Sequence, residues 1–588
     1  MRFIAAIVSF VIAFGLIAYG IAQRTVLAEP NSVTASAVLT TDATVTVIDS
    51  KTLKSLDGRQ NVDISGSDKV FAAYGRTEDV LAWVGDASYN KIGYNAQKIR
   101  LTNKLVKGTQ TEVPNPQGSD LWLGEYSRAG ALNFTVNVPD DISIVIVSDG
   151  KKPAPSDVSI RWPLDNRTPW SGPLIVGGFL FLLIGIALYL WAFIHMRRAR
   201  GPRRKSPKMP KVPRQRGYKA PKPRAVSAPA GRRSNRRRMV AVAPMVLIGA
   251  LALSGCSADL WPDFITGAST PTSTPTATAA KAPAGADVQP PAVTVPQLKH
   301  IISRISAVAA KADASIDPEL AKTRFTGAAL DLRTANYAIR KVDSTYQPEK
   351  PIPSEKIDVT LPQSTDKWPR TVFTVVSNPS DKTVPPVALT LVQAKPRDDY
   401  KVAYATALEA NTVLPQMAPA NVGATRLPPD NKLLVMAPSA LALAYGDILE
   451  KGPDSPYAKQ FDTSKDALIA LIGLDARKKL QAALPATAAM TFANSVGPDE
   501  SIALGSNDSG AIVAVYLNET VTVKPVEAGA AVNPEGAVKS LSGITGSTKG
   551  TTAVYGDQLL FYVPPISSKD KVVLLGFATG LISAKELP

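Results

Sequence analysis

The chain has very few of the residues that cross-link a protein or carry out catalysis. Cys256 is its only cysteine, so no disulfide can form within one chain and stability must come from packed cores. Its two histidines, His195 and His300, exclude a multi-histidine metal site and leave few candidates for a serine–histidine triad. Glycine-rich nucleotide loops, G-x-S-x-G, H-E-x-x-H and paired cysteines are all missing. We therefore predict no catalytic residue, metal or cofactor, and an enzyme is the less favoured interpretation.

Acidic residues are absent from one long basic stretch. Between Arg197 and Arg238 there are 18 Lys and Arg and no Asp or Glu, whereas the net charge of the whole chain is +17. This segment, rich in Pro and Gly and without apolar periodicity, is predicted to be disordered and to favour anionic lipid headgroups. Nucleic acid is an unfavoured partner, because only Tyr218 can stack on a base. The alternative is a topology signal with no further role. The residues expected to contact anionic lipid are Arg197, Arg198, Arg203, Arg204, Lys205, Arg232, Arg233, Arg236, Arg237 and Arg238.

Two apolar runs predict membrane-spanning helices. Phe3 to Ala22 is 20 uncharged residues, enough to cross about 30 Å of hydrocarbon. We predict that residues 1–22 form a transmembrane helix or signal anchor, with a cleaved signal peptide as the alternative. The second span, 173–196, has Trp170 and Trp191 near its ends, as interfacial aromatics tend to be.

A third apolar run, 239–256, follows three arginines and ends at the sole cysteine. Its apolar part contains Pro244 and is short for a span, but it fits the apolar region of a signal sequence. The run ends Leu253-Ser254-Gly255-Cys256, which resembles a bacterial lipobox. The resemblance implies that Cys256 is acylated and that the chain is cut just before it. An ordinary third span with an incidental cysteine is the alternative.

The basic stretch sets the expected topology. Lys and Arg concentrate in cytoplasmic loops, so residues 197–238 are predicted to lie inside the cell membrane. Residues 23–172 and 257–588 are then expected on the extracytoplasmic side. The bilayer is thus the first predicted partner of the chain.

The first extracytoplasmic region, 30–165, is predicted to be an all-β sandwich. Apolar residues alternate along 33–39, 45–47, 62–64, 70–74, 81–83, 132–138, 142–146 and 158–162, with turn signals between them and no convincing helix. Trp83 and Trp122 are candidates for stacking on sugars, but filling the core is the favoured interpretation.

Residues 265–295, mostly Pro, Thr, Ala and Ser, predict an extended tether on the order of 90 Å long. Two α+β units are expected after it, at 296–425 and 432–588, each with helices followed by a curled antiparallel sheet. Apolar spacing places helices after Pro296, from Asp317 to about Ile339, at 438–450 and at 464–484. Strands are expected at 357–361, 371–377, 387–395, 400–408, 489–494, 511–523, 552–563 and 571–579.

This element order resembles the cone-shaped NTF2-like fold of many bacterial lipoproteins. The whole layout is similar to actinobacterial envelope proteins that join a membrane protein to a lipoprotein-like half. The chain is accordingly predicted to be a membrane-anchored multidomain protein that binds wall polymer, protein or a small ligand, or acts as a scaffold. The alternatives are a glycan-processing enzyme and a scaffold whose basic loop recruits a cytoplasmic partner.

Overall fold

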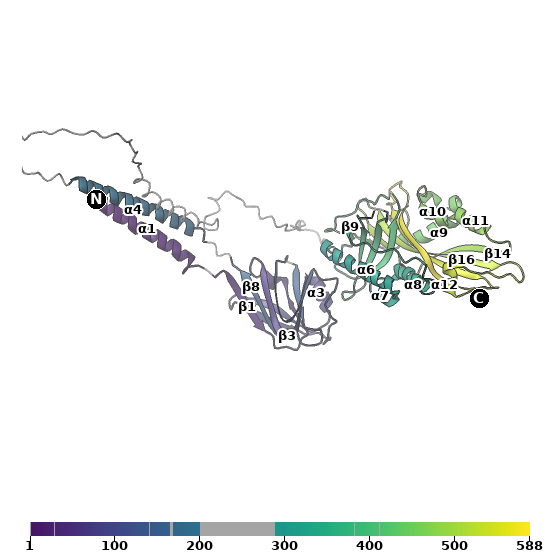
Figure 1. Cartoon of the computed structure of the whole chain (residues 1–588), viewed down its shortest axis with the longest axis horizontal. Coiled ribbons are helices and arrows are strands. Elements are labelled where there is room, and N and C mark those ends of the chain that lie inside the picture. The colour runs from purple at the N-terminus through teal and green to yellow at the C-terminus, as the bar shows by residue number, and fades with distance from the viewer. Residues whose placement is uncertain are drawn as a thin grey trace, which may run out of the picture. The chain divides into compact units, whose positions relative to one another are not determined.

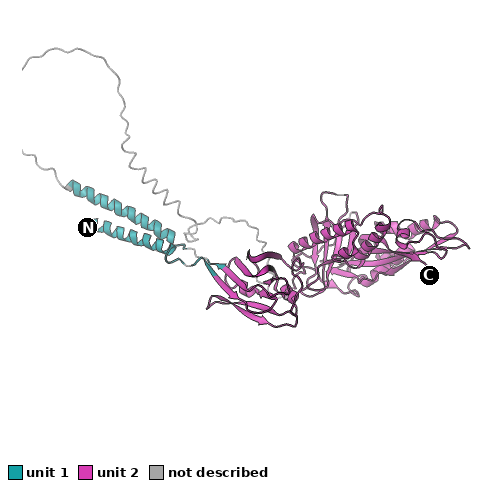
Figure 2. Ribbon diagram, turned by 60° about the horizontal axis from the view of Figure 1, so that its bottom comes forward, with its two compact units in different colours: residues 1–33, 162–281 teal, residues 34–161, 282–588 magenta. Residues whose placement is uncertain are grey.

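The computed structural model describes residues 2–28, 30–139, 141–164, 168–199, 289–381, 383–410 and 412–588. Two compact units make up the chain, residues 1–33 with 162–281 and residues 34–161 with 282–588 (Figure 2). Residues 265–288 of the predicted tether, the lipobox and most of the basic stretch lie outside the described residues. Residues 289–295, which the tether prediction also included, are described and packed: Pro291 pairs with Ser364, Val293 is buried and Val295 begins a helix.

The first unit contains two long apolar helices, α1 (Arg2–Arg24) and α4 (Ser171–Ala199), which run side by side (Figures 1 and 2). Both are long and apolar enough to cross a membrane. Their facing sides carry small residues seven positions apart, which lets the two backbones approach closely. Large side chains such as Ile4, Phe14 and Leu180 are exposed on the outer sides. The small facing residues are Ala6, Ala13 and Gly20 on α1, and Ser171, Gly178, Gly185 and Ala192 on α4.

Replacing Gly178 by leucine is expected to separate the helix pair. A Cβ atom at Gly178 would lie 2.5 Å from Cγ1 of Ile17, whereas a Cβ atom at the neighbouring Gly177 meets nothing within 4 Å. The rings of Phe3 and Tyr189 lie 5.9 Å apart across the pair, so bismaleimide cross-linking between cysteines at these two positions, in a Cys256→Ala background, measures the pairing. The Gly178→Leu change should lower the cross-linking yield several-fold and Gly177→Leu should not. Equal yields for the two variants would contradict this packing.

Residues 32–163 form a β-rich domain around one eight-stranded sheet, ordered β1-β8-β3-β7-β2-β4-β5, with β6 also paired to β3. The long strand β3 pairs with β8 through its first half and with β7 through its second. Its register with β6 shifts between Ser65 and Lys69. The strands are β1 (Ser32–Val38), β2 (Val45–Ile48), β3 (Gln60–Arg76), β4 (Tyr89–Asn95), β5 (Arg100–Val106), β6 (Gly124–Val136), β7 (Ile142–Val147) and β8 (Asp157–Pro163).

This domain differs from the predicted all-β sandwich in three respects. Its described strands belong to one continuous sheet, β2 pairs with β4 in parallel, and two short helices are present, α2 (Ser50–Leu53) and α3 (Thr77–Val84). The predicted strand at 81–83 is wrong. Glu78 and Asp79 favour a helix N-terminus, and Val80, Trp83 and Val84 form a buried helical face rather than an alternating one.

The C-terminal domain contains one ten-stranded antiparallel sheet, where two separate sheets were expected. Its order is β13-β15-β16-β17-β18-β12-β11-β10-β9, with β14 paired to β16. Helices precede strands in both halves, as expected, but β12 and β18 join the halves through Ala407–Phe577 and Leu408–Gly576. The strands are β9 (Lys356–Pro362), β10 (Arg370–Ser377), β11 (Val387–Gln393), β12 (Lys401–Leu408), β13 (Arg426–Leu427), β14 (Ala488–Val496), β15 (Ile502–Gly505), β16 (Ala511–Pro525), β17 (Thr551–Val563) and β18 (Val573–Glu586).

The helices of this domain match the apolar spacing except at two breaks and at residues 536–542, where a short helix was not expected. The expected helix from Asp317 is divided, since α7 ends at Lys322 and α8 begins at Gly327, whose φ of 55° does not fit inside a continuous helix. The expected helix at 464–484 is divided at Gly473. The α-helices are α6 (Val295–Ser315), α7 (Pro318–Lys322), α8 (Gly327–Val342), α9 (Leu441–Lys451), α10 (Ala467–Ile472), α11 (Leu474–Ala482) and α12 (Gly536–Ser542). Single 3₁₀ turns occur at Pro438–Ala440, Gly452–Asp454 and Ala458–Gln460.

Candidate functional site

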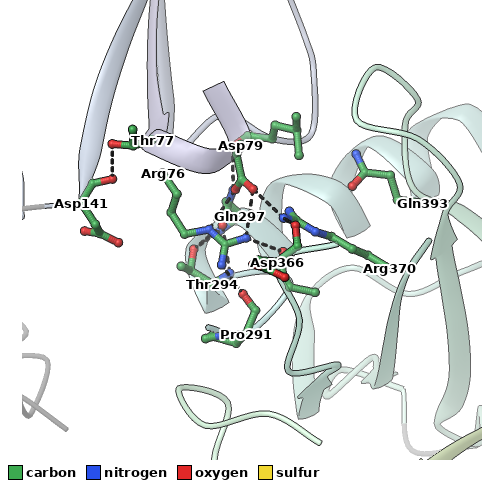
Figure 3. A network of polar contacts seen from close by, with 12 residues as sticks. Arg76, Thr77, Asp79, Asp141, Pro291, Thr294, Gln297, Asp366, Arg370 and Gln393 are labelled. Carbon is green, nitrogen blue, oxygen red and sulfur yellow. Dashed lines mark hydrogen bonds and ion pairs between the residues drawn. The ribbon is translucent and has the colours of Figure 1, made fainter. Parts of the chain in front are cut away.

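Helix α3 of the β-rich domain places one acid against the C-terminal domain. Asp79 lies in the first turn of α3 and is 1% exposed. Arg76 Nε donates to Asp79 Oδ2 at 2.9 Å, and Arg370 Nη2 donates to Asp79 Oδ1 at 2.6 Å. Arg76 Nη1 also donates to the carbonyl oxygen of Pro291, at 2.7 Å. Figure 3 shows both guanidinium groups directed at Asp79, one from each domain.

Arg370 is completely buried, which is rare for an arginine. Its guanidinium carbon lies 3.7 Å from the ring centre of Trp368, and Nη2 also donates to the carbonyl of Asp366 at 3.0 Å. Nε and Nη1 have no hydrogen-bond partner among the described residues. The carboxylate of Asp79 is therefore the main compensation for burying this cation.

The other end of α3 is held by Arg397. Its Nε donates to the carbonyl of Trp83 and its Nη2 to the carbonyl of Val84, both at 2.8 Å. These are among the last carbonyls of α3, whose partial negative charge favours a cation. Three adjacent charged residues, Arg397 to Asp399, would ordinarily form a solvated turn, but Arg397 is half-buried and bonded to α3.

A second buried acid, Asp120, lies on the same side of the contact. The backbone N–H of Tyr400 donates to its Oδ2 at 2.9 Å, and Arg304 Nη1 donates to its Oδ1 at 3.3 Å. Arg324 Nη2 donates to Oδ1 at 3.3 Å, and its Nη1 makes an ion pair with Oδ2. The side chain of Asp120 has no exposed surface, and that of Arg324 is nearly buried. Every cation on this acid comes from the C-terminal domain.

We call Arg304, Arg324, Arg370 and Arg397 the arginine clamp. Each of them binds an acid or a carbonyl of residues 30–164, so the charges of the two domains are complementary. Apolar contact accompanies the clamp. Trp368 packs on the core of the β-rich domain, where Trp83 and Trp122 are buried and meet edge to face at 5.5 Å. The core-filling interpretation of these two tryptophans is thus correct, and they are not exposed platforms for sugars.

A cavity of about 470 Å³ lies in the C-terminal domain beside the junction of β12 and β18. The strands meet there over two residue pairs, and a Cβ atom on Gly576 would lie 2.5 Å from the carbonyl oxygen of Ala407. Gln558 Oε1 accepts a hydrogen bond from the backbone of Ala405 at 2.7 Å. The cavity volume is typical of small-molecule sites, about 300–1,000 Å³. Its lining is Ala329, Leu332, Arg333, Glu349, Lys350, Pro351, Ile352, Val387, Ala405, Ala407, Leu408, Glu409, Ala410, Lys465, Ala467, Gln558, Phe577, Ala578 and Thr579.

The cavity wall combines small apolar residues with charges of both signs. Burial raises the pKa of Glu349, and the Arg333 charge opposes this shift. Burial also raises the pKa of Glu409, whose Oε1 accepts a hydrogen bond from the N–H of Ala467 at 3.0 Å. Arg333 is an ion-pair partner of Asp313 and stacks on Phe325 at 4.4 Å. With three basic and two acidic residues around an apolar wall, the cavity suits a small amphipathic molecule.

The residues predicted from sequence to contact lipid are mostly outside the described residues. Arg197 and Arg198 are described, at the end of α4, where Arg197 lies 5.4 Å from the ring centre of Phe193. Cys256 with Leu253, Ser254 and Gly255, and the basic residues from Arg203 to Arg238, fall in the segment that is not described. Acylation and lipid contact therefore stay predictions. Within the described ranges, no group of three or more His, Cys, Asp or Glu is arranged to hold a metal ion.

Sequence reasoning missed the residues of the clamp and its acids. The available signal was weak, because an acid in the first turn of a helix is common. An arginine opening a strand, as Arg370 opens β10, is equally ordinary. Only the pairing of residues some 290 positions apart makes them a site.

One comparison with known proteins gives a match, and it covers the C-terminal domain. The sequence family described as Domain of unknown function (DUF8094) matches residues 289–586. No curated protein and no solved structure matches the chain. The family match covers the helices α6 to α12, the ten-stranded sheet, the four arginines of the clamp and the cavity. The chain therefore belongs to the DUF8094 family.

Proposed function

We propose that this protein is a membrane-anchored binding protein of the cell envelope, whose C-terminal domain holds a small amphipathic ligand. The cavity beside the β12–β18 junction is the observation that carries this proposal. Its alanine-rich wall fits an apolar body. Lys350, Lys465 and Arg333 favour a ligand with an anionic or hydrogen-bonding group.

Filling the cavity should abolish binding. In the strand β12, Ala407 lines the cavity, and a phenylalanine there would occupy space that the ligand needs. The probe is 1-anilinonaphthalene-8-sulfonate, an aromatic amphiphile with one anionic group. With both proteins in the same detergent, the full-length wild type should give more probe fluorescence than Ala407→Phe. The difference in fluorescence should saturate as the probe concentration rises. The matched control, Ala493→Phe on exposed β14, should behave as the wild type. A wild-type signal that is retained in Ala407→Phe would contradict the proposal.

An enzymatic role is the weaker candidate. Glu349 and Glu409 are the two acids that line the cavity, and Glu409 is already engaged by the backbone of Ala467. Glycoside hydrolysis requires two carboxyl groups that flank the scissile bond. Nothing in the described residues shows that Glu349 and Glu409 flank a substrate in this way.

The extracytoplasmic placement of both domains is part of the proposal and is supported by the clamp. If α1 and α4 each cross the membrane once, residues 30–164 lie on one side and the chain leaves α4 on the other. The clamp keeps residues 289–588 with residues 30–164. The connector, residues 200–288, then has to cross once more, and its only long apolar run is Met239–Gly255. The basic stretch lies between α4 and this third crossing, and its Lys and Arg residues favour the cytoplasmic side.

Single-cysteine labelling tests this placement. In a Cys256→Ala background, a cysteine at the exposed Ser127 or Ser380 should react with a membrane-impermeant maleimide on intact cells. A cysteine at Ser234, within the basic stretch, should react only after permeabilisation. Labelling of position 234 on intact cells, with positions 127 and 380 protected, would reverse the proposed topology.

A further inference from the structure

The contact between the β-rich domain and the C-terminal domain has as many direct hydrogen bonds as an interface between two stable protein partners. Polar contacts run along it from Arg76 and Pro291 to Arg304 and Glu125. Gln297 Nε2 adds a bond to the carbonyl of Leu121 at 2.9 Å, and Arg304 Nη1 adds one to the carbonyl of Gly118 at 2.6 Å. Together with the clamp, these bonds are comparable to the roughly ten direct hydrogen bonds of a typical stable interface.

Each domain also has a core of its own. Val45, Phe71, Val80 and Val147 belong to the core of the β-rich domain. Separate clusters fill the C-terminal domain, around Tyr445, Ile302, Tyr516 and Leu581. Neither core needs residues from the other domain beyond Trp368, which packs at the edge of the first. The two domains thus meet as formed bodies, through charge complementarity and one aromatic anchor.

The acids at the interface are deeply buried, which decides how strongly the contact depends on them. Asp79 and Asp120 have almost no exposed side-chain surface, and Arg324 and Arg370 are nearly as buried. Pairs of this kind are screened little by salt, and truncating one partner typically costs 2–5 kcal/mol or more. None of the contacts just described involves the connector.

We propose that residues 289–588 are bound by residues 30–164 as a separable partner, so that a cut in the connector yields a two-chain complex rather than a released domain. A cut before Cys256, as the lipobox resemblance implies, is one such event. The complex would then be held by its lipid anchors and by the arginine clamp together. This inference goes beyond ligand binding and does not depend on the cavity.

The test uses the full-length chain with one added protease site. A recognition sequence for a site-specific protease is inserted after Ala280, the chain is purified in detergent through an N-terminal tag, and the connector is cut. We expect the C-terminal fragment to stay on the tagged fragment through gel filtration at micromolar concentration and physiological salt. Release of the fragment from the wild-type chain, whether it remains folded or not, would overturn the proposal.

A variant without the two buried charges distinguishes specific docking from non-specific association. The double change Asp79→Asn/Asp120→Asn should weaken retention of the cut fragment by roughly a hundredfold or more. Glu319→Gln is the matched control, since Glu319 forms an exposed ion pair with Lys322 on α7. It should leave retention unchanged. Circular dichroism of the uncut double variant checks that both domains are folded. Equal retention of the double variant and the wild type would overturn the assignment to the clamp.

Discussion

Replacing Arg370 by methionine is expected to weaken the docking of residues 289–588 on residues 30–164 by about 2–5 kcal/mol. The change leaves Asp79 buried with Arg76 as its remaining cation, and it removes the stacking on Trp368. Two buried N–H groups without partners disappear at the same time, which offsets part of the loss. The loss should still dominate, because a buried carboxylate that loses one of its two counter-charges costs more than an unpaired N–H group.

Hydrogen exchange in α3 measures this effect in the intact chain. Weaker docking should raise the exchange of Thr77–Val84 in Arg370→Met while the amides of β17 keep their protection. Arg426→Met is the control, because Arg426 forms a partly exposed ion pair with Glu500 at 3.6 Å, of the kind that contributes about 0–1 kcal/mol. Combining Arg370→Met with Asp79→Asn should cost less than the two single losses added together. Additive losses would show that the two side chains do not act as a pair.

The sequence predicts those parts of the structure that are fixed by burial of their own residues. Strands β7, β11, β12 and β16 and helix α6 follow from apolar spacing alone, because each is fixed by burial of its own residues. The joining of β12 to β18 does not follow, since it depends on a close approach at Gly576 that no local pattern announces. A helix as short as α3 has too few apolar positions for its spacing to be distinguished from that of a strand.

Charged residues at the site are still harder to predict. In the sequence Pro396-Arg397-Asp398-Asp399, a solvated turn is the ordinary expectation for three adjacent charges. Arg397 instead binds the end of α3, and Asp399 pairs with Arg324 at 3.2 Å. Burial and the nearby charge of Asp120 raise the pKa of Asp399 despite this pairing. The bonds of Arg397 to α3 join residues 313 and 314 positions apart, and single-sequence periodicity does not contain such contacts.

Asp557 differs from Asp79 and Asp120, because no arginine or lysine forms an ion pair with it among the described residues. Asp557 on β17 is fully buried, and neither carboxylate oxygen has a hydrogen-bond partner of good geometry among the described residues. Burial raises the pKa of Asp557 to about 7. The Thr579 hydroxyl and Arg477 oppose the shift, and Glu519 adds to it. Arg477 is itself paired with Glu519 at 2.7 Å. The folded domain therefore prefers Asp557 protonated.

This preference predicts a stability that falls as the pH rises. A carboxyl with a folded pKa of about 7 and an unfolded value near 3.8 contributes its full stability below pH 4 and loses it as the pH rises through 7. The loss amounts to about 4 kcal/mol, at about 1.4 kcal/mol per unit. In Asp557→Asn this loss is absent, so the variant should be the more stable protein at pH 8.5 and close to the wild type at pH 4.5.

Thermal unfolding of the full-length protein at both pH values measures the difference. Other buried acids, including Glu349 and Glu409, also lose stability as the pH rises, so only the difference between wild type and variant reports on Asp557. Asp343→Asn is the control. Hydrogen bonds from Thr345 lower the pKa of Asp343, so its effect should differ little between the two pH values. A wild-type-to-Asp557→Asn difference that does not change between pH 4.5 and 8.5 would show that this carboxyl keeps its charge inside the fold.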